Sequence, residues 1–165
     1  AMKLAAEHLL EAFVVGRGLN AIVLRPFSIY GRGMSATSLL GTIFRQALND
    51  KRVVLNNFHP VRDYCQVDDL ARAVVLAVQS GMTGLRCFNI GSGVGTSVAE
   101  LARLVMRLTG RELPLEENRT ASRPGTSEID ELVASIDNAR EFLNWQPQLT
   151  LADGLQQTLD WWRTL

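Results

Sequence analysis

Cysteine is scarce in this sequence: Cys65 and Cys87 are the only two among 165 residues. Their separation fits no metal-ligand spacing, and small secreted domains held by disulfides carry far more cysteine than this. We therefore expect two buried, reduced thiols in a cytoplasmic protein. The N-terminus also lacks the charged, apolar and small-residue order of a signal peptide.

Net charge is absent as well, because Lys and Arg together number 17 and Asp and Glu together number 17. Without a net field, no long-range attraction to nucleic acid or to an anionic membrane is expected. No apolar run reaches the roughly 18 residues of a membrane span. The expected partners therefore include neither nucleic acid nor membrane, and any anion site must be built locally.

The composition is that of a soluble globular protein, with 47% hydrophobic and 21% charged residues. The length suits one domain, so we expect residues 1–165 to form a single compact unit. Amphipathic helical patterns alternate with short apolar runs, which indicates the α/β class. The expected strands are residues 20–24, ending at Pro26, and 53–55, 62–67, 87–90 and 132–136.

The first expected helix, residues 3–15, begins without a Ser, Thr, Asp or Asn cap, which suggests that the chain begins inside a longer element. Gly16 and Gly18 are expected to end it. The inner face of the helix before Gly81 is expected to carry Leu70, Ala71, Val74, Ala77 and Val78. The expected helix starts are Ser38, Asp68 or Asp69, Ser97 with Glu100 as a capping box, Asp137 or Asn138, and Thr150.

Charged side chains are dense between Val61 and Ala71, where the sequence reads VRDYCQVDDLA. Arg62, with Arg123 from a distant turn, could clamp a diphosphate, because guanidinium forks match phosphate oxygens. The alternative is that each arginine pairs with a nearby acid, Asp63 for Arg62 and Glu128 for Arg123. For the adjacent Asp68 and Asp69, capping is favoured over acid/base catalysis.

The glycine-rich loop Gly91-x-Gly93-x-Gly95 follows an expected strand, as a dinucleotide-binding fingerprint does. The fingerprint requires a further glycine where Thr96 stands, and the next helix already has its own cap at Ser97. We therefore do not assign a cofactor to this loop.

Five motifs occur in the order found in one enzyme family. Residues 24–31, LRPFSIYG, resemble a turn that the family writes LRPFNVYG, and residues 62–71 resemble its RDYxxVxDxA. Lys3 resembles the lysine of Tyr-x-x-x-Lys. Residues 88–93, FNIGSG, and the tail from Arg123 to Trp145 complete the set. The chain resembles the C-terminal half of an extended short-chain dehydrogenase/reductase of the NAD-dependent nucleotide-sugar epimerase/dehydratase type.

The resemblance implies a fold made of the last Rossmann strand and helix elements plus a small α/β substrate-binding domain. It implies that Lys3 holds the nicotinamide ribose and lowers the pKa of the tyrosine base. The backbone around Pro26 and Phe27 would meet the nicotinamide. NAD or NADP would be the cofactor of the full-length parent.

On the substrate side, the resemblance implies that the chain binds a nucleotide-diphosphate sugar. The residues implied in this role are Ser28 facing the sugar, Val54 and Leu55 near the base, and Arg62 and Arg123 on the diphosphate. Ser28 stands where the family usually has Asn, and Ser135 where it usually has Asp.

In this resemblance the tyrosine would lie two positions before Ala1, and the N-terminal cofactor-binding half is absent. We therefore expect no turnover and no bound cofactor from this chain alone. The alternative is a non-catalytic module that binds a sugar nucleotide or docks on a subunit. An exposed first helix and strand would then favour a homo-oligomer.

Overall fold

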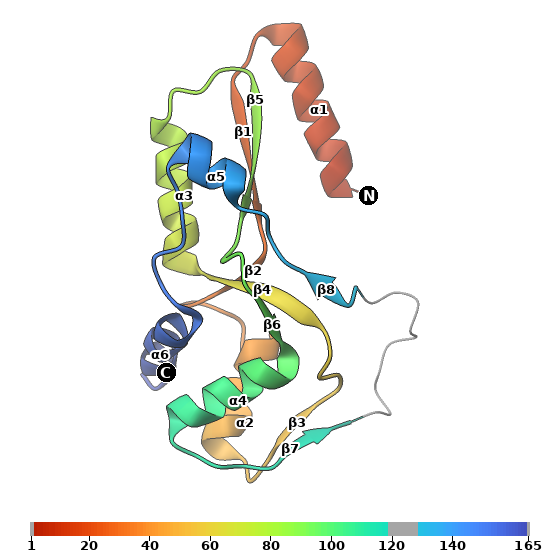
Figure 1. The fold of residues 1–165 in the computed structure, drawn as a ribbon. Coiled ribbons are helices and arrows are strands. Elements are labelled where there is room, and N and C mark those ends of the chain that lie inside the picture. Colours follow the sequence, from red (N-terminus) through yellow and green to blue (C-terminus); the bar gives the residue numbers. More distant parts are fainter. Residues whose placement is uncertain (1, 119–128, 165) are drawn as a thin grey trace.

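The computed structural model describes residues 2–118 and 129–164 (Figure 1). Its helices are α1 (Met2–Arg17), α2 (Leu39–Asn49), α3 (Val67–Gln79), α4 (Val98–Thr109), α5 (Asp137–Leu143) and α6 (Leu151–Trp162). Its strands are β1 (Ala21–Pro26), β2 (Ser28–Tyr30), β3 (Val53–Leu55), β4 (Val61–Gln66), β5 (Leu85–Ile90), β6 (Gly95–Ser97), β7 (Leu115–Glu117) and β8 (Glu131–Leu132). The predicted α/β class is confirmed.

One end of the molecule is built on the parallel pair of β1 and β5, whose register runs from Ala21 opposite Leu85 to Pro26 opposite Ile90. In Figure 1, α1 lies on one side of this pair, and α3 and α5 lie on the other. Phe88 and Ile90 join Trp145 in a core beneath these helices. β1 ends at Pro26, as predicted, since proline has no N–H to continue a ladder.

β4 joins this end of the molecule to the other. Its second half pairs in parallel with β2, so that Ser28 lies opposite Tyr64. Its first half pairs with β6 in antiparallel orientation and with β8 in parallel. Strands from three distant parts of the sequence therefore pair with β4 (Figure 1).

The other end contains α2, α4 and α6 together with the parallel pair of β3 and β7. Its core is apolar and fully buried, with Ile43 and Phe44 from α2, Leu101 from α4 and Leu155 from α6. The ring of Phe44 stacks on that of Trp162. These helices have the strongly one-sided apolar patterns that allowed their prediction.

The helix starts at Ser38, Ser97 and Thr150 are confirmed, because each side chain accepts a hydrogen bond from the first turn of its helix. The prediction that Asp68 or Asp69 caps α3 is wrong. The Gln66 side chain is the cap, and it accepts from the N–H of Asp68. A cap at Asp137 or Asn138 is also wrong, because α5 follows Ile136 without a side-chain cap.

The predicted inner face of α3 is wrong in part. Val74 and Val78 are 46% and 81% exposed and Ala71 is exposed as well, whereas Ala73 is fully buried. The helix is turned so that Asp69, one turn before Ala73, is buried in the interior of the protein. This rotation moves the two valines toward solvent.

The predicted strand 132–136 shrinks to Glu131–Leu132. The N–H of Ala134 donates to the side chain of Asp63 at 3.1 Å instead of to a neighbouring strand, so the ladder ends. Within residues 2–118 and 129–164, no helix is long and apolar enough to cross a membrane, and no group of three metal-binding side chains occurs.

Candidate functional site

The carboxyl ends of β1 and β5 bring two of the predicted cofactor residues to one edge of the sheet. Pro26 ends β1, and Phe27 follows it with its N–H donating to the carbonyl of Ile90 at the end of β5 (2.9 Å). Open α/β sheets place ligands beside this edge. Pro26 is exposed and Phe27 half-buried, so both lie near the surface.

Lys3 lies on the exposed part of α1. One helical turn later, the Glu7 carboxylate accepts two hydrogen bonds from the guanidinium of Arg25, the residue before Pro26. The bonds to Arg25 lower the pKa of Glu7. This exposed ion pair connects α1, the helix that carries Lys3, to the end of β1.

Ser28 begins β2 and lies beside β4, on which Arg62 is located. Val54 and Leu55 lie on β3, at the other end of the molecule. The Gln46 side chain bonds both the N–H and the carbonyl of Val54, which fixes this strand beside α2. Arg123 lies outside the described residues.

Arg62 does not pair with Asp63, so that alternative from the sequence is wrong. Neighbouring side chains on a strand point to opposite faces. The Arg62 Nη1 group donates to two backbone carbonyls, those of Val61 (2.8 Å) and Asp130 (3.4 Å). Among the described residues, no carboxylate forms an ion pair with this half-buried guanidinium, and its Nε and Nη2 donors make no hydrogen bond.

The glycine-rich loop binds an anion, but that anion belongs to the protein itself. Asp63 is fully buried, and its Oδ1 accepts from the Ser92 N–H and hydroxyl (2.5 and 2.6 Å). Its Oδ2 accepts from the N–H of Gly93 and of Ala134 (2.9 and 3.1 Å). A Cβ on Gly91 would lie 2.5 Å from Oδ2, so glycine is required for this close approach.

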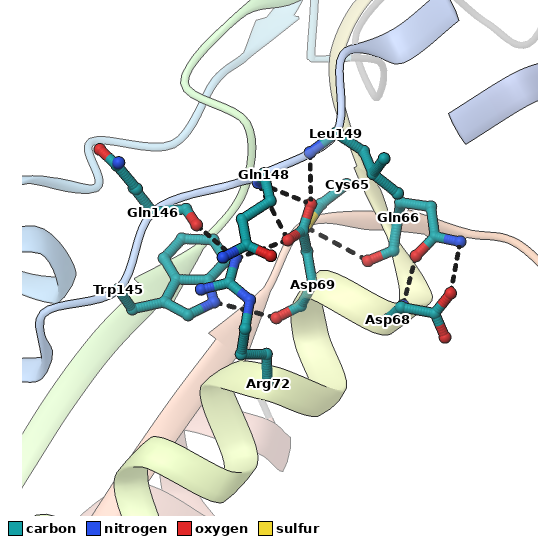
Figure 2. Close-up of polar contacts among 9 residues, drawn as sticks. All are labelled: Cys65, Gln66, Asp68, Asp69, Arg72, Trp145, Gln146, Gln148 and Leu149. Carbon is teal, nitrogen blue, oxygen red and sulfur yellow. Dashed lines mark hydrogen bonds and ion pairs between the residues drawn. The ribbon is translucent and has the colours of Figure 1, made fainter. Parts of the chain in front are cut away.

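Asp69, which sequence reasoning considered only as a cap or a catalyst, has a different role (Figure 2). Its carboxylate is buried and accepts from Arg72 (2.6 Å) and from the N–H groups of Gln148 and Leu149. Its carbonyl accepts from the indole of Trp145 at 2.9 Å. Asp69 therefore joins α3 to the segment that leads into α6, which accounts for its charge without a catalytic role.

A cavity of about 400 Å³ borders β4 on the side of Tyr64 and Thr96, and Thr96 lies opposite Arg62 in the strand register. The Tyr64 hydroxyl is buried, with no hydrogen-bond partner among the described residues. Burial raises the pKa of Tyr64 to about 12, so at neutral pH the phenol is uncharged.

Neither buried carboxylate was assigned its role from the sequence. One signal was available for Asp63, since strand alternation excludes a contact with Arg62 next to it. The backbone N–H partners of both groups lie 29 to 80 residues away, and no local pattern predicts them; only Arg72, three residues after Asp69, is a local partner.

The described geometry can be compared with known proteins. The sequence profile described as "NAD dependent epimerase/dehydratase family" matches residues 1–91. A UDP-glucose 4-epimerase of Azospirillum brasilense is 33% identical, and the match covers 100% of this chain and 52% of that protein. GDP-L-fucose synthase 1 of Arabidopsis thaliana is 32% identical over 97% of this chain and 51% of its own length.

A solved UDP-glucose 4-epimerase of Thermotoga maritima, in complex with UDP-glucose, superposes with a TM-score of 0.83 at 28% identity. That match covers 98% of this chain and 52% of the other. A further structure, of a protein in complex with UDP-glucuronic acid and NAD, has a TM-score of 0.86 at 29% identity and covers 98% of this chain and 54% of that one.

The chain thus spans about half the length of the curated relatives that it matches. The profile match covers more than half of the 165 residues, and the similarity to the Azospirillum enzyme extends over all of them. The chain belongs to the NAD dependent epimerase/dehydratase family.

Proposed function

We propose that this chain is the C-terminal, sugar-nucleotide-binding half of an NAD(P)-dependent nucleotide-sugar epimerase or dehydratase. The observation that carries the proposal is the state of Arg62. Its guanidinium is held by two carbonyls and is free of carboxylates among the described residues, so its charge is not neutralised there. A diphosphate is a dianionic ligand, and such a guanidinium fork can form two parallel hydrogen bonds with its phosphate oxygens.

In this proposal Arg62 and Arg123 bind the diphosphate of the sugar nucleotide. Ser28 faces the sugar, and Val54 and Leu55 lie near the base. Two solved relatives support this ligand class, because one was determined with UDP-glucose and the other with UDP-glucuronic acid.

Lys3, Pro26 and Phe27 would face NAD or NADP, which supplies hydride transfer when bound in the full-length parent. The Glu7–Arg25 ion pair supports this assignment because it connects the helix of Lys3 to the residue before Pro26. The N–H groups of Ser92 and Gly93 are already used by Asp63 and cannot also hold a pyrophosphate. We expect the chain alone to bind no cofactor and to catalyse no turnover.

Isothermal titration with UDP and with dTDP tests the diphosphate site. We expect Arg62→Ala and Arg123→Ala each to weaken binding about 10- to 100-fold, since a charge-assisted hydrogen bond contributes about 1.5–3 kcal/mol. Arg17→Ala, at the far end of α1, is the matched control and should bind as wild type does. Equal affinity in wild type and both site variants would refute the site.

A second candidate function is docking, either on a further subunit or on a second copy of this chain. The supporting observation is that α1 has no buried residue, and Met2, Leu9 and Phe13 are exposed on one of its faces. In the described residues β1 pairs only with β5, so its other edge offers free backbone donors and acceptors. We propose that α1 and β1 form the contact surface of a homo-oligomer.

A further inference from the structure

We propose that Asp63 is a positioning residue of the anion site: it locks β8 against β4 so that Arg62 presents its Nε–Nη2 edge to the ligand. The inference rests on the proposed function for the identity of the ligand. Its structural part concerns only how the Arg62 side chain is held.

Asp63 joins three segments of the chain. It lies on β4, three of its four donor groups belong to Ser92 and Gly93 in the loop after β5, and the fourth is the N–H of Ala134 just after β8. The space is filled, because a Cβ on Gly91 would lie 2.5 Å from Asp63 Oδ2 and 2.6 Å from the Cβ of Ala134. The segment after β8 therefore has one well-defined position relative to β4.

β8 is connected to Arg62 by strand register and by one hydrogen bond. Val61 pairs with Glu131 and Arg62 with Leu132, so β8 is in register with the first residues of β4. The residue before β8, Asp130, supplies the carbonyl that accepts from Arg62 Nη1. Asp63 thus sets the place of one of the two carbonyls that hold the guanidinium.

Among the described residues, the donors of Arg62 that remain free lie on Nε and Nη2. Nη1 donates to two carbonyls, those of Val61 and Asp130. A guanidinium carries five N–H donors, of which one lies on Nε and two lie on Nη2. The Nε–Nη2 edge is the one left for two parallel bonds to a phosphate.

The site requires an acceptor at residue 63. All of its backbone partners are N–H donors, and an amide in place of the carboxylate would turn an NH₂ group toward them. We expect Asp63→Asn to release β8 and, with it, the tether on Arg62. Asp69→Asn is the matched control, because Asp69 is also a buried carboxylate that accepts backbone N–H groups, but it contacts neither β8 nor Arg62.

The experiment has two readouts. The first is NMR of the Arg62 Nε–H in the ligand-free protein, where we expect slow guanidinium rotation in wild type and Asp69→Asn and fast rotation in Asp63→Asn. The second is UDP titration, where we expect Asp63→Asn to weaken binding about tenfold, the effect of losing one charge-assisted hydrogen bond. In an Arg62→Ala background the same change should have no further effect.

Unchanged Arg62 rotation in folded Asp63→Asn overturns the proposal, as does a loss of affinity that persists in the Arg62→Ala background. A wild type that binds no UDP, but whose Arg62 is released by Asp63→Asn, refutes the ligand and supports the positioning role. If Asp63→Asn does not fold, Ser92→Ala replaces it. That variant removes one of the four donors, and an Arg62 rotation rate equal to that of wild type would then refute the role.

Discussion

Gly154, a single residue inside α6, sets the distance between that helix and β2. A Cβ at this position would lie 2.1 Å from the Tyr30 hydroxyl oxygen and 3.2 Å from the Gln66 side chain. Tyr30 is buried, and its hydroxyl makes only a long bond of 3.5 Å to the carbonyl of Leu151. The hydroxyl is therefore held only weakly by its acceptor, but it leaves no room for a side chain at residue 154.

We expect Gly154→Ala to lower the free energy of unfolding by about 1–3 kcal/mol, the usual cost of overpacking a core. Adding Tyr30→Phe removes the clashing oxygen, so the double variant should be more stable than Gly154→Ala alone. Urea unfolding measures the free energy of unfolding of wild type, of Gly154→Ala and of the double variant. Gly16→Ala is the control, because Gly16 is helical with open space around it and alanine there should stabilise by up to about 1 kcal/mol. Stabilisation by Gly154→Ala would contradict the packing.

At the same scale, the residues that the sequence assigned correctly are those whose partners are close in the chain. Ser97 and Glu100 are three positions apart and form the predicted capping box. Asp69 was assigned to a local cap and instead binds residues 79 and 80 positions away. Side-chain chemistry predicted that these acids need donors, but only the tertiary fold decides which ones.

Helices that begin at a Ser or Thr cap were predictable, and α4 offers a test of how much the cap contributes. Ser97 accepts from the N–H of Glu100, and the Glu100 carboxylate accepts from the N–H and hydroxyl of Ser97. These bonds lower the pKa of Glu100 below 4.5. A carboxyl whose pKa is lowered in the folded state stabilises above its unfolded pKa and loses that effect in acid.

Ser97→Ala should lower the free energy of unfolding by about 1 kcal/mol at pH 7. The difference from wild type should shrink as the pH falls below 4.5, through the lowered pKa of folded Glu100. Urea unfolding at pH 7 and pH 3 measures the change. Ser135→Ala is the control, since that hydroxyl bonds the exposed Asp137 but caps no helix. A pH-independent difference would show that Glu100 takes no part.

Strand and helix positions followed from local apolar patterns, but their rotation did not. Val74 and Val78 fit the apolar face of α3 as well as Ala73 does, and the buried Asp69 decides between the two faces. The pairing of β4 with three other strands could not be predicted from local patterns either, because strand partners are determined by the whole fold.

For the whole molecule, the exposed face of α1 predicts self-association. Met2, Leu9 and Phe13 are 88%, 61% and 46% exposed and recur at helical spacing. Exposed apolar side chains on one face of a helix are typical of interfaces, and a two-fold dimer is the simplest closed arrangement.

We expect light scattering coupled to gel filtration to give a mass above that of the 18.2 kDa chain, rising with concentration. Leu9→Ser combined with Phe13→Ser should return the mass to that of a monomer. Phe142→Ser, which removes a phenylalanine that is 59% exposed on α5, should leave the association unchanged. A wild type that stays monomeric at high concentration would contradict the proposed surface.

The carboxylate of Asp63 also constrains the order in which the chain assembles. Its donors lie 29, 30 and 71 residues away, so two loops of very different length must close around one charge. Closing the longer loop costs about 0.8 kcal/mol more in chain entropy. The shorter loop is therefore favoured to close first, and the bond from Ala134 is favoured to form after those from Ser92 and Gly93. The last contact of this junction to form is then the one that brings β8 beside Arg62.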